Sequence, residues 1–167
     1  MKFKRLDAAV KASKKHLTDT AAFGTEIEGY LVAYLLVITY AEFEGALHKL
    51  VDARMHKGST DGPVLKFIKS FLKRNVTKLG RIYISDLGGR LERFDTSSKT
   101  AFMKEIENQP HHQAWDSILN NRHAGAHPGG QLQMNFNDFE IAYRDSLTVI
   151  RAFGRHCGLT VTEINDL

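Results

Sequence analysis

The sequence predicts an all-α fold, a bundle of five or six helices, from three observations. Apolar residues recur at three- and four-residue spacing over residues 25–56, which is the signature of a long amphipathic helix. No segment alternates strongly between apolar and polar residues, as a half-buried strand would. The three prolines, at positions 63, 110 and 128, punctuate the chain and leave long stretches open to helix.

The first two helices are expected over residues 5–17 and 25–56. The first has basic residues on its outer side. In the second, Thr25 with Glu28 three residues on resembles a capping box, and Gly58 marks the end. The inner stripe of this helix is Leu36, Tyr40, Phe43, Leu47 and Leu50.

The later elements are less uniform. Pro63 opens a helix that runs to about Arg74, while residues 81–94 begin like a strand and end like a helix. Asn137 and Glu140 form a second capping-box-like pair, and the tail LTVTEINDL can form a short terminal strand. Further helices are predicted over residues 96–108, 111–125 and 138–156.

Composition describes an ordinary soluble chain of one domain. The 167 residues are 43% hydrophobic and 25% charged, and the net charge of +4 is compatible with a nucleic-acid partner without demonstrating one. Cys157 is the sole cysteine, which excludes an intramolecular disulfide and fits a reducing compartment. We expect it to be a buried cysteine, since the adjacent His156 would point about 100° away from it on a helix.

We expect no membrane span and no secretory signal. The longest apolar run covers residues 30–41, whereas a span needs about 20 apolar residues. Acidic residues flank the run, and the basic N-terminus is not followed by a long apolar stretch. These features favour a buried core helix in a soluble, cytoplasmic protein.

The stretch NNRHAGAHPGG, residues 120–130, is the strongest candidate for chemistry. Residues five apart on one helix lie about 140° apart, so Arg122 and His127 would diverge if the helix continued. His127 precedes Pro128, which disfavours helical geometry there, and Gly125 can adopt backbone angles closed to other residues. We therefore expect Arg122 on the last helical turn and His127 beyond it.

An arginine and a histidine together suit the cleavage of an RNA phosphodiester. A guanidinium forks onto phosphate oxygens, and a histidine transfers protons near neutral pH. That scheme needs no metal and no cofactor. A polar, glycine-rich helix end is nevertheless most often only a helix end, so the spacing alone favours a structural role.

Other sites fit the same residues less well. His123 and His127 are four apart and could bind a metal, but no third or fourth ligand is obvious nearby, since His111, His112 and Asp116 lie well before them in the chain. The HExxH, P-loop and GxSxG patterns are not met either.

Basic residues at helical spacing form a stripe, and bulky aromatic residues occur elsewhere in the chain. Together they suggest a surface that binds RNA. The stripe is either a solvated helix face or a surface that tracks phosphates. The aromatic side chains could stack bases, although each is expected in the core. The stripe is Lys66, Lys69, Lys73 and Arg74, and the aromatics are Phe94, Trp115 and Phe136.

The segment WDSILNNRHAGAH resembles the signature of the HEPN superfamily, small all-α domains with an R-x(4–6)-H motif after a helix. Arg122 matches the arginine, His123 the polar residue that follows it, and His127 the histidine. The commonest follower is Asn, from which His123 departs. The long early helix is also similar, and Glu42 or Glu44 would be the acidic residue that often supports the site.

The resemblance implies a single HEPN-like domain over residues 1–167, with its core at about 25–155. It implies a metal-independent endoribonuclease in which two motifs face each other across a homodimer and leave a 2′,3′-cyclic phosphate. Many such domains are toxins or act in antiviral defence against phage, so an antitoxin or defence protein would be a partner. Other members are inactive modules that bind protein or RNA, and this alternative stays open.

Overall fold

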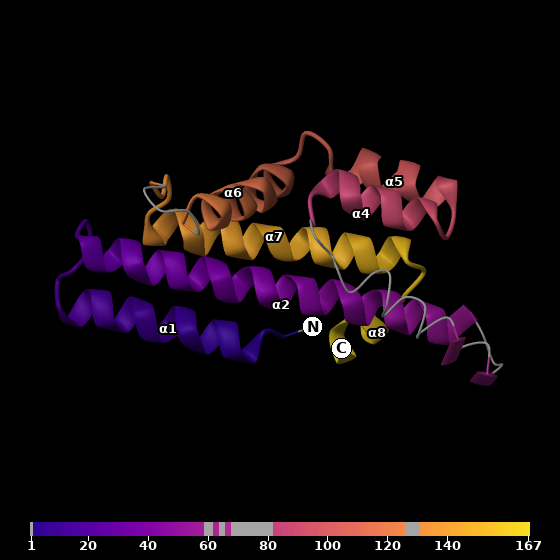
Figure 1. The fold of residues 1–167 in the computed structure, drawn as a ribbon, viewed down its shortest axis with the longest axis horizontal. Coiled ribbons are helices and arrows are strands. Elements are labelled where there is room, and N and C mark those ends of the chain that lie inside the picture. The colour runs from indigo at the N-terminus through magenta and orange to yellow at the C-terminus, as the bar shows by residue number, and fades with distance from the viewer. Residues whose placement is uncertain (1, 59–61, 64–65, 68–81, 126–130) are drawn as a thin grey trace. The chain divides into compact units, whose positions relative to one another are not determined.

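The computed structural model describes residues 2–58, 62–63, 66–67, 82–125 and 131–167. These residues form helices and no strand, which confirms the all-α prediction (Figure 1). The helices are α1 (Lys4–Asp19), α2 (Glu26–Gly58), α4 (Ile84–Glu92), α5 (Thr96–Ile106), α6 (Pro110–Gly125), α7 (Phe136–His156) and α8 (Val161–Asp166).

The helices contribute to two compact units. The first unit comprises residues 2–43 and 106–149, and the second comprises residues 44–105 and 150–167. Both α2 and α7 supply residues to each unit.

Stacked aromatic rings form the core of the first unit, where α1 runs alongside the first half of α2 (Figure 1). Phe43 of α2 stacks on Trp115 of α6, with ring centroids 5.0 Å apart and an interplanar angle of 4°. Tyr143 of α7 lies 6.3 Å from Phe43 on another side, and Phe3 meets it edge-on at 5.8 Å. One side chain of α2 thus joins α6, α7 and the start of α1.

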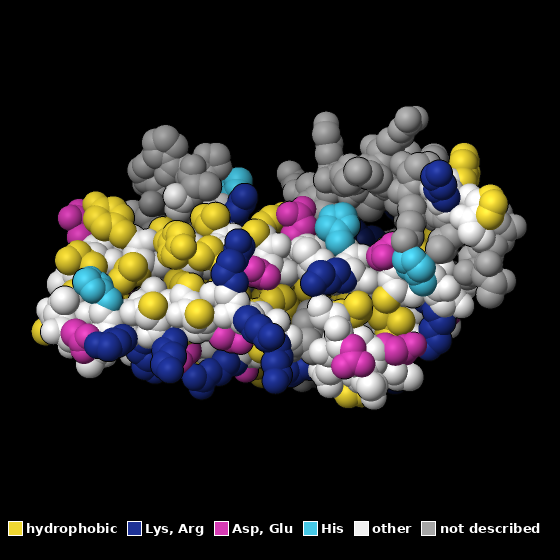
Figure 2. Space-filling view, turned by 90° about the horizontal axis from the view of Figure 1, so that it is seen from below, with side chains coloured by type: hydrophobic (Ala, Val, Ile, Leu, Met, Phe, Trp, Pro, Cys, Tyr) yellow, Lys and Arg dark blue, Asp and Glu magenta, His cyan; other side chains and the backbone are white. Residues whose placement is uncertain are grey.

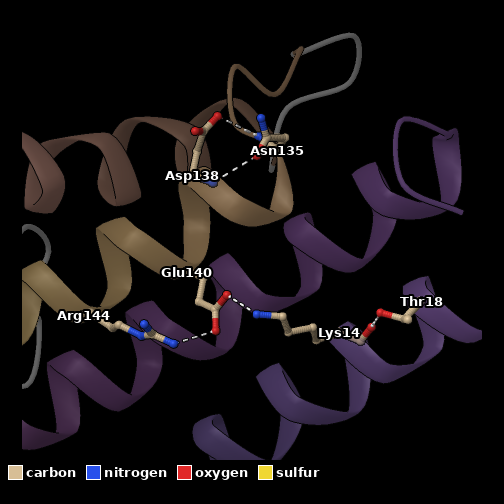
Figure 3. Close-up of polar contacts among 6 residues, drawn as sticks. All are labelled: Lys14, Thr18, Asn135, Asp138, Glu140 and Arg144. Carbon is tan, nitrogen blue, oxygen red and sulfur yellow. Dashed lines mark hydrogen bonds and ion pairs between the residues drawn. The ribbon is translucent and has the colours of Figure 1, made fainter. Parts of the chain in front are cut away.

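Polar contacts fix α1 against α7 in the same unit. The Lys14 ammonium lies 2.7 Å from Glu140 Oε2, and Arg144 binds the other oxygen of that carboxylate at 2.8 Å (Figure 3). Further along, the Tyr143 hydroxyl donates to Asp7 Oδ1 at 2.7 Å. Two positions of α1 that are about two turns apart, Asp7 and Lys14, are therefore bound to α7.

The start of α2 differs from the expected capping box. Glu28 is buried, and its carboxylate accepts hydrogen bonds from the backbone N–H of Gly24 at 2.6 Å and of Phe136 at 2.8 Å. Thr25 donates its hydroxyl to the Ala22 carbonyl instead of capping the helix. Glu28 thus joins the beginnings of α2 and α7, which are 108 positions apart in the chain.

The start of α7 lies two residues earlier than predicted. Asn135 Oδ1 accepts from the N–H of Asp138 at 2.9 Å, and the Asn135 N–H lies 3.5 Å from Asp138 Oδ2 (Figure 3). The cap is therefore the pair Asn135 and Asp138. Asn137 and Glu140 share the same spacing, but Glu140 binds Lys14 and Arg144 instead.

The second unit contains two helices that were not predicted from the sequence. The secondary structure of one was left open, and the other was predicted as a strand. Within the ambiguous segment 81–94, Ile84–Glu92 form α4, whose first turn is capped by Asp86 Oδ2 accepting from the Tyr83 N–H at 3.3 Å. The predicted terminal strand is wrong, because the tail forms α8. Thr160 and Glu163 form a capping box at its start, with distances of 3.2 and 2.6 Å.

Close helix packing holds this second unit together. Phe102 of α5 meets Phe153 of α7 edge-on, with ring centroids 6.1 Å apart. A Cβ at Gly154 would lie only 2.8 Å from Ile164 of α8 and 3.0 Å from Leu50 of α2. Glycine at this position lets the three helices approach one another.

α2 is long and apolar enough to cross a membrane, by length and composition alone. Core helices of soluble proteins have the same properties, and one face of α2 is fully buried within the chain. That face includes Val32, Leu35, Leu36, Phe43, Leu47 and Leu50.

Candidate functional site

Arg122 lies in the last turn of α6, as predicted. Its guanidinium carbon is 4.5 Å from the ring centroid of Tyr40 on α2, a cation–π contact that contributes on the order of 0.5–2 kcal/mol. The side chain is half-buried, and its Nε has no hydrogen-bond acceptor among the described residues. Since an unsatisfied buried N–H is unfavourable, an anion that reached this nitrogen would be stabilised.

Asn121, the residue before Arg122, anchors the chain that returns to α6. Its buried side chain donates to the Ser117 carbonyl at 2.9 Å and accepts from the Gln133 N–H at 2.7 Å. Gln133 is therefore bound to α6 by the residue that precedes Arg122.

Gly125 has a different role from the one expected. It is still part of α6, so no unusual backbone angle is needed to end the helix there. A Cβ at Gly125 would lie 3.2 Å from Leu132 and 3.9 Å from Ala33 of α2. Glycine thus allows α6 to approach α2 and the returning chain.

The two histidines of the motif stand differently. His123 is exposed in the last turn of α6, next to Arg122. His127 belongs to residues 126–130, outside the described residues. The proximity of Arg122 and His127 therefore stays a prediction.

The two acidic candidates on α2 have different surroundings. Glu42 forms an ion pair with Arg5 of α1 at 2.9 Å. Glu42 follows Tyr40 by two positions, which is a rotation of about 200° around α2. Glu42 therefore points away from Tyr40, the residue that contacts Arg122. Glu44 lies one helical turn after Tyr40 and acts electrostatically on His48, whose pKa is lowered by burial against the opposing effect of Glu44. A supporting role for either acid stays a prediction.

The predicted RNA-contacting residues are only partly described. Lys66 is exposed, whereas Lys69, Lys73 and Arg74 lie outside the described residues. Trp115 and Phe136 are fully buried, as expected of core residues, and Phe94 is half-buried.

Three further titratable residues, His112, Asp116 and Cys157, are not part of the motif. His112 pairs with Asp116 on α6 at 3.3 Å, and burial raises the pKa of Asp116 despite that histidine. No group of three possible metal ligands occurs in the part of the chain that the structure describes, which leaves out His127. Cys157 is buried as predicted, and burial raises the pKa of its thiol to about 12, against a smaller opposing effect of Arg54.

An exposed apolar stripe on α2 was missed in the sequence. We call it the α2 stripe: Ile27, Tyr30, Tyr34 and Val37, exposed by 46%, 68%, 57% and 53%. These residues recur every three or four positions, on the side of α2 opposite the buried Leu36. The sequence contained a signal for this stripe, namely apolar residues at helical spacing on both faces of α2. A helix that is apolar on both faces needs a packing partner on each.

The α2 stripe borders the arginine of the motif. Tyr40 follows Val37 by three positions on α2, and Ala33, beside Gly125, precedes Tyr34. Figure 2 shows hydrophobic side chains gathered over the part of the molecule where α1 and the first half of α2 lie. Arg122 thus stands at the edge of an exposed apolar surface.

Comparison with known proteins gives one family. The model of the family described as RiboL-PSP-HEPN matches residues 3–158 of the chain. Neither the curated proteins nor the solved structures contain a significant match.

Proposed function

Since the chain belongs to the RiboL-PSP-HEPN family, we propose that it is a metal-independent endoribonuclease that acts as a homodimer. The observation that carries this proposal is the position of Arg122. It is held on Tyr40 at the exposed end of α6, with an Nε that lacks an acceptor among the described residues. His123 and His127 follow it closely in the sequence.

In the proposed reaction, the 2′-oxygen of RNA attacks the adjacent phosphorus, and the bond from phosphorus to the 5′-oxygen breaks. His127 takes the proton of the 2′-hydroxyl or gives one to the departing 5′-oxygen, and His123 orients the substrate or shares the proton transfer. Arg122 stabilises the charge that develops on the phosphoryl oxygens. The products are a 2′,3′-cyclic phosphate and a 5′-hydroxyl, and DNA is spared because it lacks the attacking group.

The α2 stripe supports the homodimer. Exposed apolar patches of this kind mark interaction surfaces, and a patch without charged groups can pair with its own copy about a two-fold axis. Because the stripe borders Tyr40 and Ala33, such pairing would bring the two copies of Arg122 toward one seam. Each motif could then supply the charge or the proton transfer that the other lacks.

By analogy with the family, we assign this activity to a cytoplasmic toxin or an effector of phage defence. Its partners would be an RNA substrate, a second copy of the chain, and an antitoxin or another defence protein. The alternative is a non-catalytic module that binds protein or RNA. The stacking of Arg122 on Tyr40 is compatible with that alternative too, since it is also a structural contact between α6 and α2.

The test is cleavage of end-labelled RNA by the purified chain in EDTA, with single-stranded DNA of the same sequence beside it. RNA cleavage should persist in EDTA and leave cyclic phosphate ends. His127→Ala should lower the rate about 100-fold or more, because general acid–base catalysis contributes that much. Arg122→Lys should also be impaired, since lysine keeps the charge but loses the fork.

His16→Ala is the matched control, because His16 is an exposed histidine on α1. Loss of cleavage in EDTA, or full activity of His127→Ala, would contradict the mechanism. A parent protein that binds RNA without cutting it, and that loses its dimer on Arg122→Ala, would support the non-catalytic module.

A further inference from the structure

Residues 1–19, which include α1, are one of two strongly basic stretches of the chain, and residues 64–81, with six Lys or Arg and no Asp or Glu, are the other. Residues 1–19 contain six Lys or Arg and two Asp or Glu, a net charge of +4, and the rest of the chain contains 17 of each. α1 itself, Lys4–Asp19, contains five Lys or Arg and two Asp, a net charge of +3.

Three of these cations form a row on the outside of α1. Lys4, Lys11 and Lys15 are separated by seven and four positions, so they lie within about 40° around the helix. All three are exposed, whereas Leu6 and Leu17 on the other side of α1 are fully buried. We call this row the α1 stripe; Lys and Arg side chains line the lower left edge of Figure 2, where α1 lies.

Neighbouring cations hold α1 in place and leave the stripe open. Lys14 binds Glu140 of α7 (Figure 3). Arg5 binds Glu42 of α2. Within the described residues, Lys4 and Lys11 form no ion pair, and Lys15 pairs only with Asp19 on its own helix.

The location of Lys4 is unfavourable for the isolated helix. It lies in the first turn of α1, where the helix dipole disfavours a cation, and Phe3 provides no side-chain cap there. Arg5 in the same turn is compensated by Glu42, but Lys4 has no such partner among the described residues. A local cost of this kind is typical of a site that binds something.

We propose that the α1 stripe binds the phosphate backbone of single-stranded RNA and leads it toward Arg122. The substrate class rests on the function proposed above. Lys4 to Lys15 spans about 16 Å, which is about five steps of a stacked strand at about 3.4 Å each. Lysine ammonium groups suit this role, because they contact phosphates as point charges without reading bases.

The N-terminal end of the stripe lies close to the level of the motif. Arg5 follows Lys4 and pairs with Glu42, which is two residues, or about 3 Å along the axis of α2, from Tyr40. Tyr40 carries Arg122 on another side of α2. A strand that leaves α1 at Lys4 is therefore already at the level of Arg122 along α2.

An anionic membrane is the less favoured ligand. Interfacial helices bury their apolar face in the lipid, but Leu6 and Leu17 of α1 are already buried within the chain. The stripe can therefore offer a membrane only its charges.

The test measures RNA binding in a His127→Ala background, so that cleavage does not interfere. Lys4→Gln, Lys11→Gln and Lys15→Gln are combined in one variant. For this variant, the slope of log RNA affinity against log salt concentration should be smaller in magnitude by about 2. Each lost phosphate contact with a single strand lowers the magnitude of that slope by about 0.7. The triple Lys→Arg variant should bind as tightly as the parent, and single-stranded DNA should compete nearly as well as RNA.

The matched control neutralises Arg93, Lys104 and Arg151 to Gln, three exposed cations elsewhere, and gives the same net charge. Equal losses in both triple variants would overturn the proposal, because net charge alone would then explain binding. Unchanged RNA binding in the triple Lys→Gln variant would also overturn the proposal. That holds even if this variant binds phosphatidylserine vesicles more weakly than the parent protein does. The His127→Ala variant tests the proposed catalysis separately. If the parent protein binds RNA through the α1 stripe but never cleaves it, only the proposed catalysis is refuted.

Discussion

Cys157 and Arg122 both lie at the C-terminal end of a helix, but burial gives them different chemistry. Cys157 is enclosed by the second unit, and its thiol is held in the neutral form. Arg122 is only half-buried and lies at the edge of the exposed α2 stripe. The sequence predicted a buried Cys157, because a lone cysteine is usually buried, and a last-turn Arg122, because Gly125 and Pro128 follow it. The aromatic platform under Arg122 could not be predicted, since Tyr40 is 82 positions away.

At the residue scale, Cys157 should react with Ellman's reagent about a thousandfold more slowly than an ordinary thiol at pH 8. With a pKa of about 12, the thiolate is a very small fraction of the thiol at that pH, whereas a free cysteine has a pKa near 8.5. The exposed Thr162→Cys supplies a matched reporter on α8. Its added thiol should react at once, and Cys157 should react only after denaturant is added. Rapid labelling of the native parent protein would contradict the burial.

At the element scale, long helices were predictable because their apolar periodicity extends over many turns. The ends were less so. Asn135 with Asp138 and Asn137 with Glu140 have the same spacing, and only the contact of Glu140 with Lys14 decides between them. The helical tail was signalled by the capping pair of α8, Thr160 with Glu163, but its apolar β-branched residues pointed to a strand. A short helix is decided by packing, here of Ile164 against Gly154.

Glu28 gives a prediction at this scale, because one carboxylate closes the N-termini of both α2 and α7. Glu28→Gln keeps one oxygen acceptor but turns an amide N–H₂ toward the second backbone donor. The expected loss is about 1–3 kcal/mol in the free energy of unfolding, measured by urea denaturation. Glu26→Gln, an exposed change in the same helical turn, should cost less than about 1 kcal/mol. Equal losses would show that Glu28 acts only through the helix dipole.

For the whole molecule, the predicted core helix over residues 30–41 was only half right. One face is buried, but Tyr30, Tyr34 and Val37 of the α2 stripe are exposed. Apolar content predicts that a helix needs partners, not whether they belong to the same chain. The pairing of two motifs in a homodimer was therefore predicted only from the resemblance to the HEPN superfamily. The structure adds an exposed apolar surface beside Arg122.

A lysine in the centre of that surface should separate the two copies. Tyr34→Lys would place an ammonium group in a seam without charged partners, so light scattering should show a shift from dimer toward monomer. RNA cleavage should fall in parallel and recover as the protein concentration rises, because mass action restores the pair. Ile141→Lys is the control, an equally exposed apolar residue on α7. Circular dichroism should show that both variants keep their helices.

Three outcomes distinguish the possible roles of the stripe. If Tyr34→Lys stays dimeric while Ile141→Lys dissociates, the seam lies on α7 and the α2 stripe has another partner. If the parent protein is a monomer that still cleaves RNA, one copy of Arg122 and its histidines is sufficient, and the composite site is wrong. If dissociation and loss of cleavage follow the same concentration dependence, the site requires the pairing of two chains. That coupling is the expected result, because the stripe and Tyr40, which holds Arg122, belong to the same helix.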